Sequence, residues 1–433
     1  MIARRALVMF AGLFVLIAAI GWTPNVGLGS PYMSLLLVQS FAYALIALGL
    51  NIQWGYGGLF NFGIMGMLML GGAATTFIST PVLPGFWSSD GPLMLGKALL
   101  AFALGFLLVW AARKSDRIGI RGGWKTALIV VAWIIAYIVY RSQIDAAAAY
   151  IEATPDGWIG GLGLHPLVGW LFGGVLAAGV AYIVGKICLG LRTDYLAIAT
   201  IGISEIIRAL LKNMDWLTRG TLTVSPIPWP TPLPQDFQET GTPITDSFIY
   251  ARLGFLGLVL IVLVVAFFLV QRAYGGPWGR MMRAIRDNYI AAASMGKDIT
   301  SRQLEVFILG SVLMGIGGAM LVSFQQIYDP GSFQPINHTF LIWVMVIVGG
   351  AGNNWGAVFG AMLIYITWMI SDPVSQWLFN LISHWSSDIG IGPIPDIQSR
   401  ASQMRVFVLG VVITIALRYA PRGLIPEVVR REA

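Results

Sequence analysis

The chain has 433 residues, of which 57% are hydrophobic and only 11% are charged. Soluble globular domains carry about 25% charged residues, so this composition excludes an ordinary soluble domain. Repeated apolar runs of about twenty residues, each long enough to cross a bilayer, predict an all-α polytopic membrane protein with one transmembrane domain over residues 1–433. The formal charge of +7 does not indicate nucleic-acid binding. Excess Lys and Arg in a membrane protein normally mark cytoplasmic loops.

About twelve membrane segments are predicted from these runs. In chain order they are residues 6–22, 32–51, 59–78, 93–110, 127–140, 167–189, 195–211, 248–270, 303–324, 339–348, 357–370 and 406–417. The basic start and apolar run of residues 1–22 also fit a cleaved signal sequence, which stays open as an alternative. Residues 339–348 are too short for an ordinary span, so they and residues 357–370 equally fit a broken or re-entrant hairpin.

The basic residues predict the orientation of these segments. Lys and Arg gather at residues 4–5, 113–125, 279–298 and 418–431, which fall on one side of the membrane if the segments alternate. By the positive-inside rule that side is the cytoplasm, and both termini are then cytoplasmic. The proline-rich residues 227–243 form an external loop, either a connector or a docking surface. Residues 93–140 are interpreted as an inserted helical hairpin.

Residues 279–298 are predicted to form a helix that cannot cross the membrane, because six charges in twenty residues would be too costly in hydrocarbon. Those charges are Arg280, Arg283, Arg286, Asp287, Lys297 and Asp298. At helical spacing a narrow stripe of uncharged residues forms one face. It consists of Met282, Ile285, Tyr289, Ala292 and Gly296. This face is suited to the groove of another protein.

Two polar, glycine-rich breaks interrupt strongly apolar runs near opposite ends of the chain. The first contains Asn51, Gln53, Gly55, Gly57, Gly58 and Asn61, and the second is GGAGNNWG, residues 349–356, with Gly349, Gly350 and Asn353. Broken segments in corresponding positions are typical of translocation pathways. For the first break, a tight turn between helices on the cytoplasmic side is an equal alternative.

Few side chains in the chain carry catalytic or ligand-binding chemistry. Glu205 and Arg208 lie three residues apart, inside or near the membrane. They are predicted either to belong to the translocation pathway or to form an ion pair that holds helices together. Residues 91–98 nearly match a phosphate-binding loop, but Ala98 replaces the magnesium-binding Ser or Thr. The three histidines and the single Cys188 show no metal-site spacing. No cofactor or metal is therefore predicted.

Several blocks of the sequence resemble a known family. TDYLAIATIGISEIIRALL (193–211), the run 279–320 and VMVIVGGAGNNWGAVFGAML (344–363) are similar to LivM-type permeases of branched-chain amino-acid ABC importers. LGLNIQWGYGGLFNFG (48–63) is similar to that family's early glycine-rich segment. The blocks occur in the family's order across residues 34–422. The hairpin at 93–140 is not part of the shorter family pattern.

The resemblance implies a bacterial inner-membrane importer with four kinds of subunit. This chain and a second, similar permease would form the channel, with two cytoplasmic ATPase subunits and a periplasmic substrate-binding protein. It also implies that residues 283–296 are the cytoplasmic coupling helix. The family's usual acidic residue ahead of the alanines is absent here, and Asp287 is the nearest carboxylate. Which residue makes the charged contact therefore stays open.

Two other functions remain as alternatives at this point. One is a permease of the same family for urea or short amides, which share the architecture. The other is a stand-alone transporter coupled to an ion gradient, for which Glu205 is the best membrane carboxylate. Whether the chain pairs with itself or with a distinct permease is also open.

Overall fold

The computed structural model describes residues 8–15, 30–115, 122–220, 222–388 and 396–427. These residues are mostly helical, and their only β-type pairing is an isolated antiparallel bridge between Val224 and Tyr328. Among them, eight helices are long and apolar enough to cross a membrane. The predicted all-α polytopic class is thereby confirmed, whereas the count of twelve segments stays a prediction.

Connections of different lengths join the helices in chain order. The first half contains α2 (Ser30–Leu50), η2 (Asn51–Tyr56), α3 (Ile64–Ser79), α4 (Pro84–Trp87), α5 (Gly91–Arg113), α6 (Gly123–Glu152), α7 (Pro166–Cys188), α8 (Thr193–Asn213) and α9 (Asp215–Thr218). The second half contains α10 (Pro234–Glu239), α11 (Ile244–Gly275), α12 (Pro277–Asp287), α13 (Tyr289–Ser294), α14 (Ile299–Gln325), η4 (Ile336–Phe340), α15 (Leu341–Gly349), α16 (Asn354–Asp388) and α17 (Ile397–Tyr419).

Three predicted segments differ from ordinary spans. Helix α3 and the continuous η4–α15 segment are apolar but shorter than the eight candidate spans, and α8 is not among the eight. Short or broken helices are tolerated in membranes where protein covers their backbone. Of the predicted first segment, residues 8–15 are described and helical. The predicted cytoplasmic termini lie outside the described residues.

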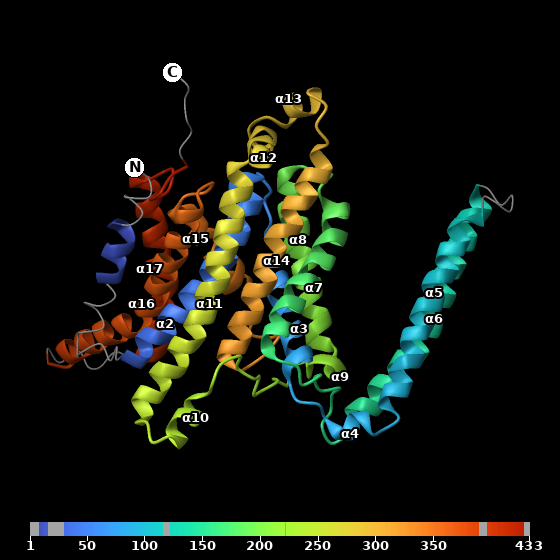
Figure 1. Cartoon of the computed structure of the whole chain (residues 1–433), viewed down its shortest axis with the longest axis horizontal. Helices are drawn as coiled ribbons and strands as arrows, with labels where there is room; N and C mark the ends of the chain where they lie inside the picture. The colour runs from blue at the N-terminus through green and yellow to red at the C-terminus, as the bar shows by residue number, and fades with distance from the viewer. Residues whose placement is uncertain (1–7, 16–29, 116–121, 221, 389–395, 428–433) are drawn as a thin grey trace.

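The centre of the bundle is formed by α2, α3 and α14. Helix α14 packs against α2, α3 and α7, and α2 also packs against α11 and α16. Most residues of the hydrophobic stretch of α2 are buried inside the protein, as they are in α14. Segments from both ends of the chain are thus brought together around α2, as Figure 1 shows.

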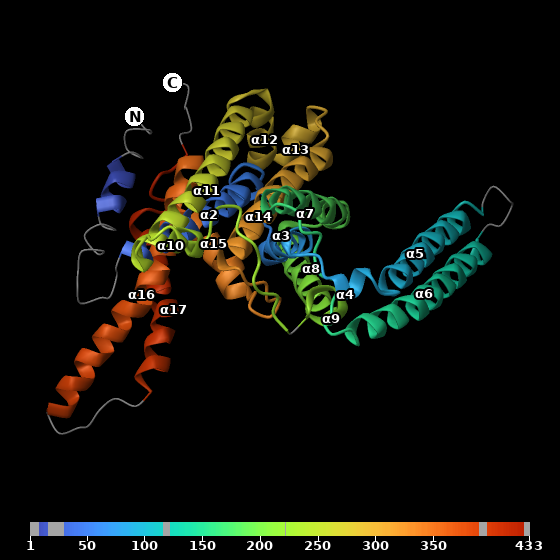
Figure 2. The same ribbon diagram turned by 60° about the horizontal axis from the view of Figure 1, so that its bottom comes forward.

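Helices α5 and α6 form a long hairpin that projects away from the bundle, as Figures 1 and 2 show from two directions. They pack extensively on each other, and the hairpin touches the rest of the protein mainly at its base, through α4 and α9. The hairpin predicted at residues 93–140 is present, with α6 extending to Glu152. That it is an insertion stays a prediction.

The end of the bundle at which α12 and α13 lie is called here the α12 end (Figure 1). Helix α11 leads into α12 at this end, and α14 begins there after α13. The first break, at η2, also lies here, because α12 contacts η2. Both predicted functional regions therefore meet at one end of the molecule.

Candidate functional site at the junction of the two breaks

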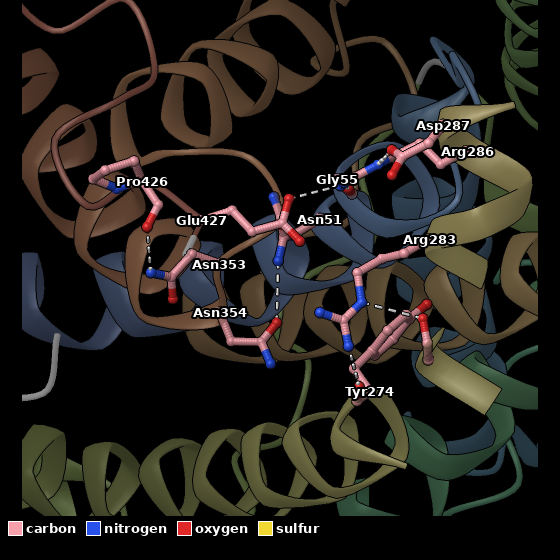
Figure 3. A network of polar contacts seen from close by, with 12 residues as sticks. Asn51, Gly55, Tyr274, Arg283, Arg286, Asp287, Asn353, Asn354, Pro426 and Glu427 are labelled. Atoms are coloured by element: carbon pink, nitrogen blue, oxygen red, sulfur yellow. Dashed lines mark hydrogen bonds and ion pairs between the residues drawn. The ribbon is translucent and has the colours of Figure 1, made fainter. Parts of the chain in front are cut away.

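The first break begins where α2 changes to the wider π-helix η2. Asn51 and Gln53 of η2 have no exposed surface, so their amides need partners inside the protein. Figure 3 shows Asn51 reaching the second break, with its Nδ2 donating to Oδ1 of Asn354 at 3.0 Å. In return, the backbone N–H of Gly352 donates to Oδ1 of Asn51 at 2.8 Å. The two glycine-rich breaks are therefore joined directly.

Gly55 is required by the closeness of this junction. A Cβ atom at this position would overlap both Oδ1 of Asn51 and the backbone nitrogen of Gly352. Because these are the two atoms of the inter-break hydrogen bond, any side chain would separate the breaks. The junction also extends to α11, since Nδ2 of Asn354 donates to Oε1 of Gln271 at 2.9 Å.

A second set of amides ties the first break to α14 and α15. Nε2 of Gln53 donates to the carbonyl oxygen of Phe307 at 2.7 Å, and Nδ2 of Asn61 donates to Oε1 of Gln53 at 2.8 Å. Nε1 of Trp343 donates to the carbonyl oxygen of Asn61 at 3.1 Å. Gly57 packs closely against Val306 of α14. These polar groups are satisfied internally and fix the packing of the break.

Arg286 of α12 connects the surface helix to this junction. Its Nη1 donates to the carbonyl oxygen of Gly55 and lies 2.9 Å from Oε2 of Glu427. Its Nε also lies 3.1 Å from Oδ1 of Asp287. Burial alone would lower the pKa of Arg286, but the carboxylates of Glu427 and Asp287 raise it above its ordinary value. The guanidinium therefore stays charged and holds three segments together.

Arg283 of α12 binds backbone carbonyl groups near the connection between α11 and α12. Its Nη2 donates to the carbonyl oxygen of Tyr274 at 3.1 Å, and its Nε donates to that of Gly279 at 3.3 Å. The ring of Tyr274 in turn stacks on Tyr56 of η2, with 3.8 Å between ring centroids. Arg283 thus stiffens the connection between α11 and α12 and is linked to the first break through Tyr274.

The chain after α17 forms the cover of the second break, which the sequence did not indicate. The backbone N–H groups of Leu424 and Ile425 donate to the carbonyl oxygens of Val348 and Gly349, each at 2.9 Å. Nδ2 of Asn353 donates to the carbonyl oxygen of Pro426 at 3.2 Å. Gly350, with φ of 118°, lies against this segment. These contacts satisfy the carbonyl groups that end α15.

The prediction of one continuous helix over residues 279–298 is wrong. The chain forms α12 and α13, with Asn288 between them in an extended conformation (φ −154°, ψ 96°). Oδ1 of Asn288 accepts a hydrogen bond from the N–H of Ala291 at 3.0 Å, which caps α13. Asparagine is a favoured N-cap residue, so this side chain explains the break.

The break also changes which side chains face outward. Met282, Ile285 and Ala292 of the predicted stripe are buried within this chain, so they cannot enter a partner's groove. Tyr289 is 63% exposed, and Gly296 is exposed after α13 with φ of 74°. Two apolar side chains that the stripe left out, Ile290 and Met295, are also exposed. The outward apolar surface thus lies on and just after α13.

Glu205 and Arg208 lie away from the junction, on α8. Nε of Arg208 is 3.6 Å from Oε2 of Glu205, and its Nη1 donates to the carbonyl oxygen of Phe333 at 3.2 Å. Both side chains are partly exposed on a helix whose surface also carries the exposed residues Ile198 and Ile206. The pair ties α8 to the segment before η4 and also presents charge at the protein surface.

A stack of aromatic rings beside α8 was missed by the sequence analysis. Trp343 stacks on Phe62, with 4.6 Å between ring centroids, and on Phe60, with 5.6 Å. Trp54 lies 4.8 Å from Trp343. The stack adjoins α8, because the N–H of Phe62 donates to Oγ1 of Thr200 at 3.0 Å. These rings come from distant parts of the chain, so no sequence spacing reveals them.

Within the described residues, no group of three His, Cys, Asp or Glu side chains could hold a metal ion. The site consists of the two joined breaks, the contacts that Arg286 makes from the surface helix α12 to Gly55 and Glu427, and the aromatic stack around Trp343. Together with the apolar bundle, these define a polytopic helical membrane protein with the broken segments of a transport protein.

Comparison with known proteins identifies the family. Residues 32–157 and 127–417 match the model of the branched-chain amino acid transport system permease component. The chain belongs to this family. The resemblance to LivM-type permeases predicted from the sequence is thereby confirmed, and the chain is a membrane transport permease component.

Individual relatives agree with this membership. The chain is 32% identical to the high-affinity branched-chain amino acid permease LivM of Salmonella typhimurium, over 45% of this chain and 48% of that protein. The match thus spans about half the length of that relative, and the same holds for LivM of Escherichia coli.

More distant relatives are matched over longer stretches. A probable LivM of Methanocaldococcus jannaschii is 22% identical over 91% of this chain and 93% of its own length. The fructose import permease FrcC of Rhizobium meliloti is 25% identical over 67% of this chain and 78% of its own. No solved structure matches the chain significantly.

Proposed function

We propose that this chain is the permease subunit of an ATP-driven importer in a bacterial inner membrane, with branched-chain amino acids as its cargo. It would work with a second homologous permease, two cytoplasmic ATPase subunits and a periplasmic substrate-binding protein. Its own role is to form part of the pathway and to receive movement from the ATPases. The observation that carries this proposal is the clamp from Arg286 of α12 to Gly55 and Glu427.

The clamp supports ATP-driven coupling for a mechanical reason. Helix α12 is short and lies at the surface, yet Arg286 joins it to the backbone of η2 and to the segment covering the second break. Packed elements move as bodies, so a displacement of α12 is transmitted to both breaks. A cytoplasmic partner that moves α12 can thereby change the shape of the junction at Asn51 and Gly352.

Helix α13 and the turn after it supply the surface for that partner. Tyr289, Ile290 and Met295 are all more than 60% exposed, although they lie beside the buried Ala292. Solvent-exposed apolar side chains grouped on one short segment fit a groove of a partner protein. Asp287, exposed at the end of α12 shortly before α13, supplies a charge beside that groove.

Helix α8 is proposed to face the second permease. Glu205 and Arg208 are partly exposed, and an ionisable pair facing lipid would be costly. Beside them, Ile198 and Ile206 are also exposed. A surface that mixes charge with large apolar side chains suits a second membrane protein with a water-accessible path between them.

The aromatic stack next to α8 would line that path. Phe60 and Phe340 are exposed at this surface, and Trp54 and Phe62 are partly exposed. Rings of this kind offer apolar contact for an aliphatic side chain without binding it tightly through charge. At the α12 end, the path would close at the junction of the two breaks, formed by Asn51, Gly55, Gly57, Asn61, Gly349, Gly350 and Asn353.

The cargo is tested by reconstituting the chain with its neighbouring transporter subunits in proteoliposomes. ATP hydrolysis is then measured with the binding protein loaded with leucine, with fructose, or with urea or acetamide. Stimulation by leucine alone supports the proposal. Stimulation by one of the other compounds would show that the cargo is not a branched-chain amino acid, while the importer itself would still be supported.

A separate arm tests the ion-coupled transporter, for which Glu205 would carry the coupling. Uptake by this chain alone, abolished when the proton or sodium gradient is collapsed, would overturn the importer. Because Glu205 is already paired with Arg208 at 3.6 Å, we expect the chain alone to transport nothing.

A further inference from the structure

The hairpin of α5 and α6 has almost no protein neighbours along its length. Large apolar side chains are exposed on both helices, including Phe106 at 67% and Trp133 at 56%. Figures 1 and 2 both show the hairpin separated from the bundle, and in Figure 1 the last turns of α5 lie toward the α12 end. In a membrane, hydrocarbon rather than water must cover such a surface.

One face of the hairpin is hollowed. A cavity of about 330 Å³ lies there, within the size range of roughly 300–1,000 Å³ typical of small-molecule sites. Helix α5 lines it with Phe102, Gly105, Phe106, Val109, Trp110 and Arg113. Helix α6 adds Trp133, Ala136, Tyr137 and Tyr140. The lining is almost entirely apolar, with one full charge at Arg113.

The close packing of the two helices explains why this cavity has a firm floor. A Cβ atom at Gly105 would lie 2.9 Å from that of Ala136, so the backbones approach closely at this level. Further from Arg113, the rings of Phe102 and Tyr140 meet edge to face, with 5.5 Å between centroids. This pair closes one end of the cavity. The cavity is therefore a groove with a definite end.

The length of the groove matches one leaflet of a bilayer. From Phe102 to Arg113 the helix advances by eleven residues, which at 1.5 Å each is about 16 Å. Half of the hydrocarbon core, which is about 30 Å thick, is about 15 Å. An acyl chain that enters at Arg113 and runs to the Phe102–Tyr140 pair would span its leaflet.

The open end of the groove is basic. Arg113 ends α5, Lys114 follows it with Nζ 3.6 Å from the ring centre of Trp110, and Lys125 begins the first turns of α6. Basic pockets between membrane helices at the cytoplasmic surface suit anionic lipid head groups.

We propose that the α5–α6 hairpin binds one anionic phospholipid. An acyl chain occupies the groove between Phe102 and Arg113, and the phosphate is held by Arg113 and Lys114. The ligand class is a phospholipid with a net negative head group, such as phosphatidylglycerol or cardiolipin. The inference is independent of the cargo and of the partners proposed above.

The test uses the full-length chain, purified from nanodiscs that contain equal amounts of phosphatidylglycerol and phosphatidylethanolamine. Retained lipid is counted by native mass spectrometry. We expect phosphatidylglycerol to be enriched in the bound fraction. Arg113→Gln should lower its occupancy about fivefold, since one basic residue near an anionic lipid contributes about 1 kcal/mol. Arg113→Lys should keep most of the occupancy.

The matched control is Arg141→Gln, in the interior of α6 next to Tyr140 but not in the groove lining, where Arg141 is exposed and paired with Asp145 at 2.8 Å. This variant should retain phosphatidylglycerol like the wild type. Equal retention of both lipids by the wild type, or the same loss in both glutamine variants, would overturn the proposal.

A cross-linking experiment separates a lipid from a protein occupant. A photoreactive phenylalanine analogue is placed at Phe106, which lines the groove and is exposed. Irradiation of native membranes should give adducts with the mass of a phospholipid. Adducts with a protein instead would show that the groove is a protein-docking surface and would contradict the lipid site.

Discussion

The guanidinium of Arg286 donates to the carbonyl oxygen of Gly55, which joins a surface helix to the π-helical turn at the end of α2. These residues are 231 positions apart in the chain. The same guanidinium pairs with Glu427, beyond the last helix. One side chain thus connects the α11–α12 corner, the first break and the C-terminal cover of the second break.

The ion pair of Arg286 and Glu427 is expected to stabilise the fold measurably. Both side chains are mostly buried, so solvent screens them less than an exposed pair. A double-mutant cycle with Arg286→Gln and Glu427→Gln should give a coupling energy of about 1–2 kcal/mol in denaturant unfolding. The exposed pair Arg141 and Asp145 is the control, with a coupling energy of about 0–0.5 kcal/mol. Equal values for the two pairs would contradict the clamp.

Gly55→Ala is expected to destabilise the protein by about 2 kcal/mol, because the new methyl group would force Asn51 and Gly352 apart. Gly257→Ala in α11 is the matched control, since no atom outside its own helix backbone lies within 4 Å of the added methyl group. The control should be neutral or stabilising by about 0.5–1 kcal/mol. Thermal unfolding in detergent measures both. A Gly55→Ala variant as stable as the control would show that the junction accommodates a methyl group and is not closely packed there.

Tyr289→Ala is expected to weaken binding of the ATPase subunits without affecting membrane insertion, because Tyr289 is exposed on α13 and packs little within the chain. Loss of an exposed aromatic anchor at an interface costs about 2 kcal/mol, or roughly thirtyfold in affinity. Co-purification with the ATPase measures the effect. Tyr250→Ala, on the exposed surface of α11, serves as control and should leave binding unchanged. Undiminished co-purification of the Tyr289 variant would place the docking surface elsewhere.

A photoreactive residue at position 206 of α8 is expected to capture the second permease in assembled membranes. The comparison is position 269 of α11, because Leu269 and Ile206 are exposed to a similar extent. The midsection of α11, residues 253–271, carries no charge, whereas Ile206 lies next to Glu205. We therefore expect lipid adducts from position 269. Lipid adducts alone from position 206 would argue against α8 as the pairing surface.

The helical class, the hairpin and both glycine-rich breaks could be predicted because each depends on local composition. The family resemblance also depended on short blocks that stay intact in the chain. The junction could not be predicted, because Asn51, Gly352 and Glu427 are brought together by long-range packing. Periodicity alone placed Met282 and Ile285 on an outward stripe, although the fold buries both.

The break between α12 and α13 does have a signal in the sequence. Asn288 is a favoured helix N-cap, and a run of good helix formers begins three residues later at Ala291, Ala292 and Ala293. That signal marks the start of a new helix inside the predicted one. The aromatic stack around Trp343 had no comparable signal, since its rings come from η2, the loop after it and α15.

The most direct test of the account is leucine uptake by proteoliposomes that contain the assembled transporter with Arg286→Ala. The variant should still bind the ATPase subunits, because Tyr289, Ile290 and Met295 are unchanged. We expect ATP hydrolysis to continue while uptake falls at least about tenfold, since α12 is no longer clamped to Gly55. Arg280→Ala, an exposed arginine of the same helix, should transport normally. Normal uptake by the Arg286 variant would contradict the proposed coupling.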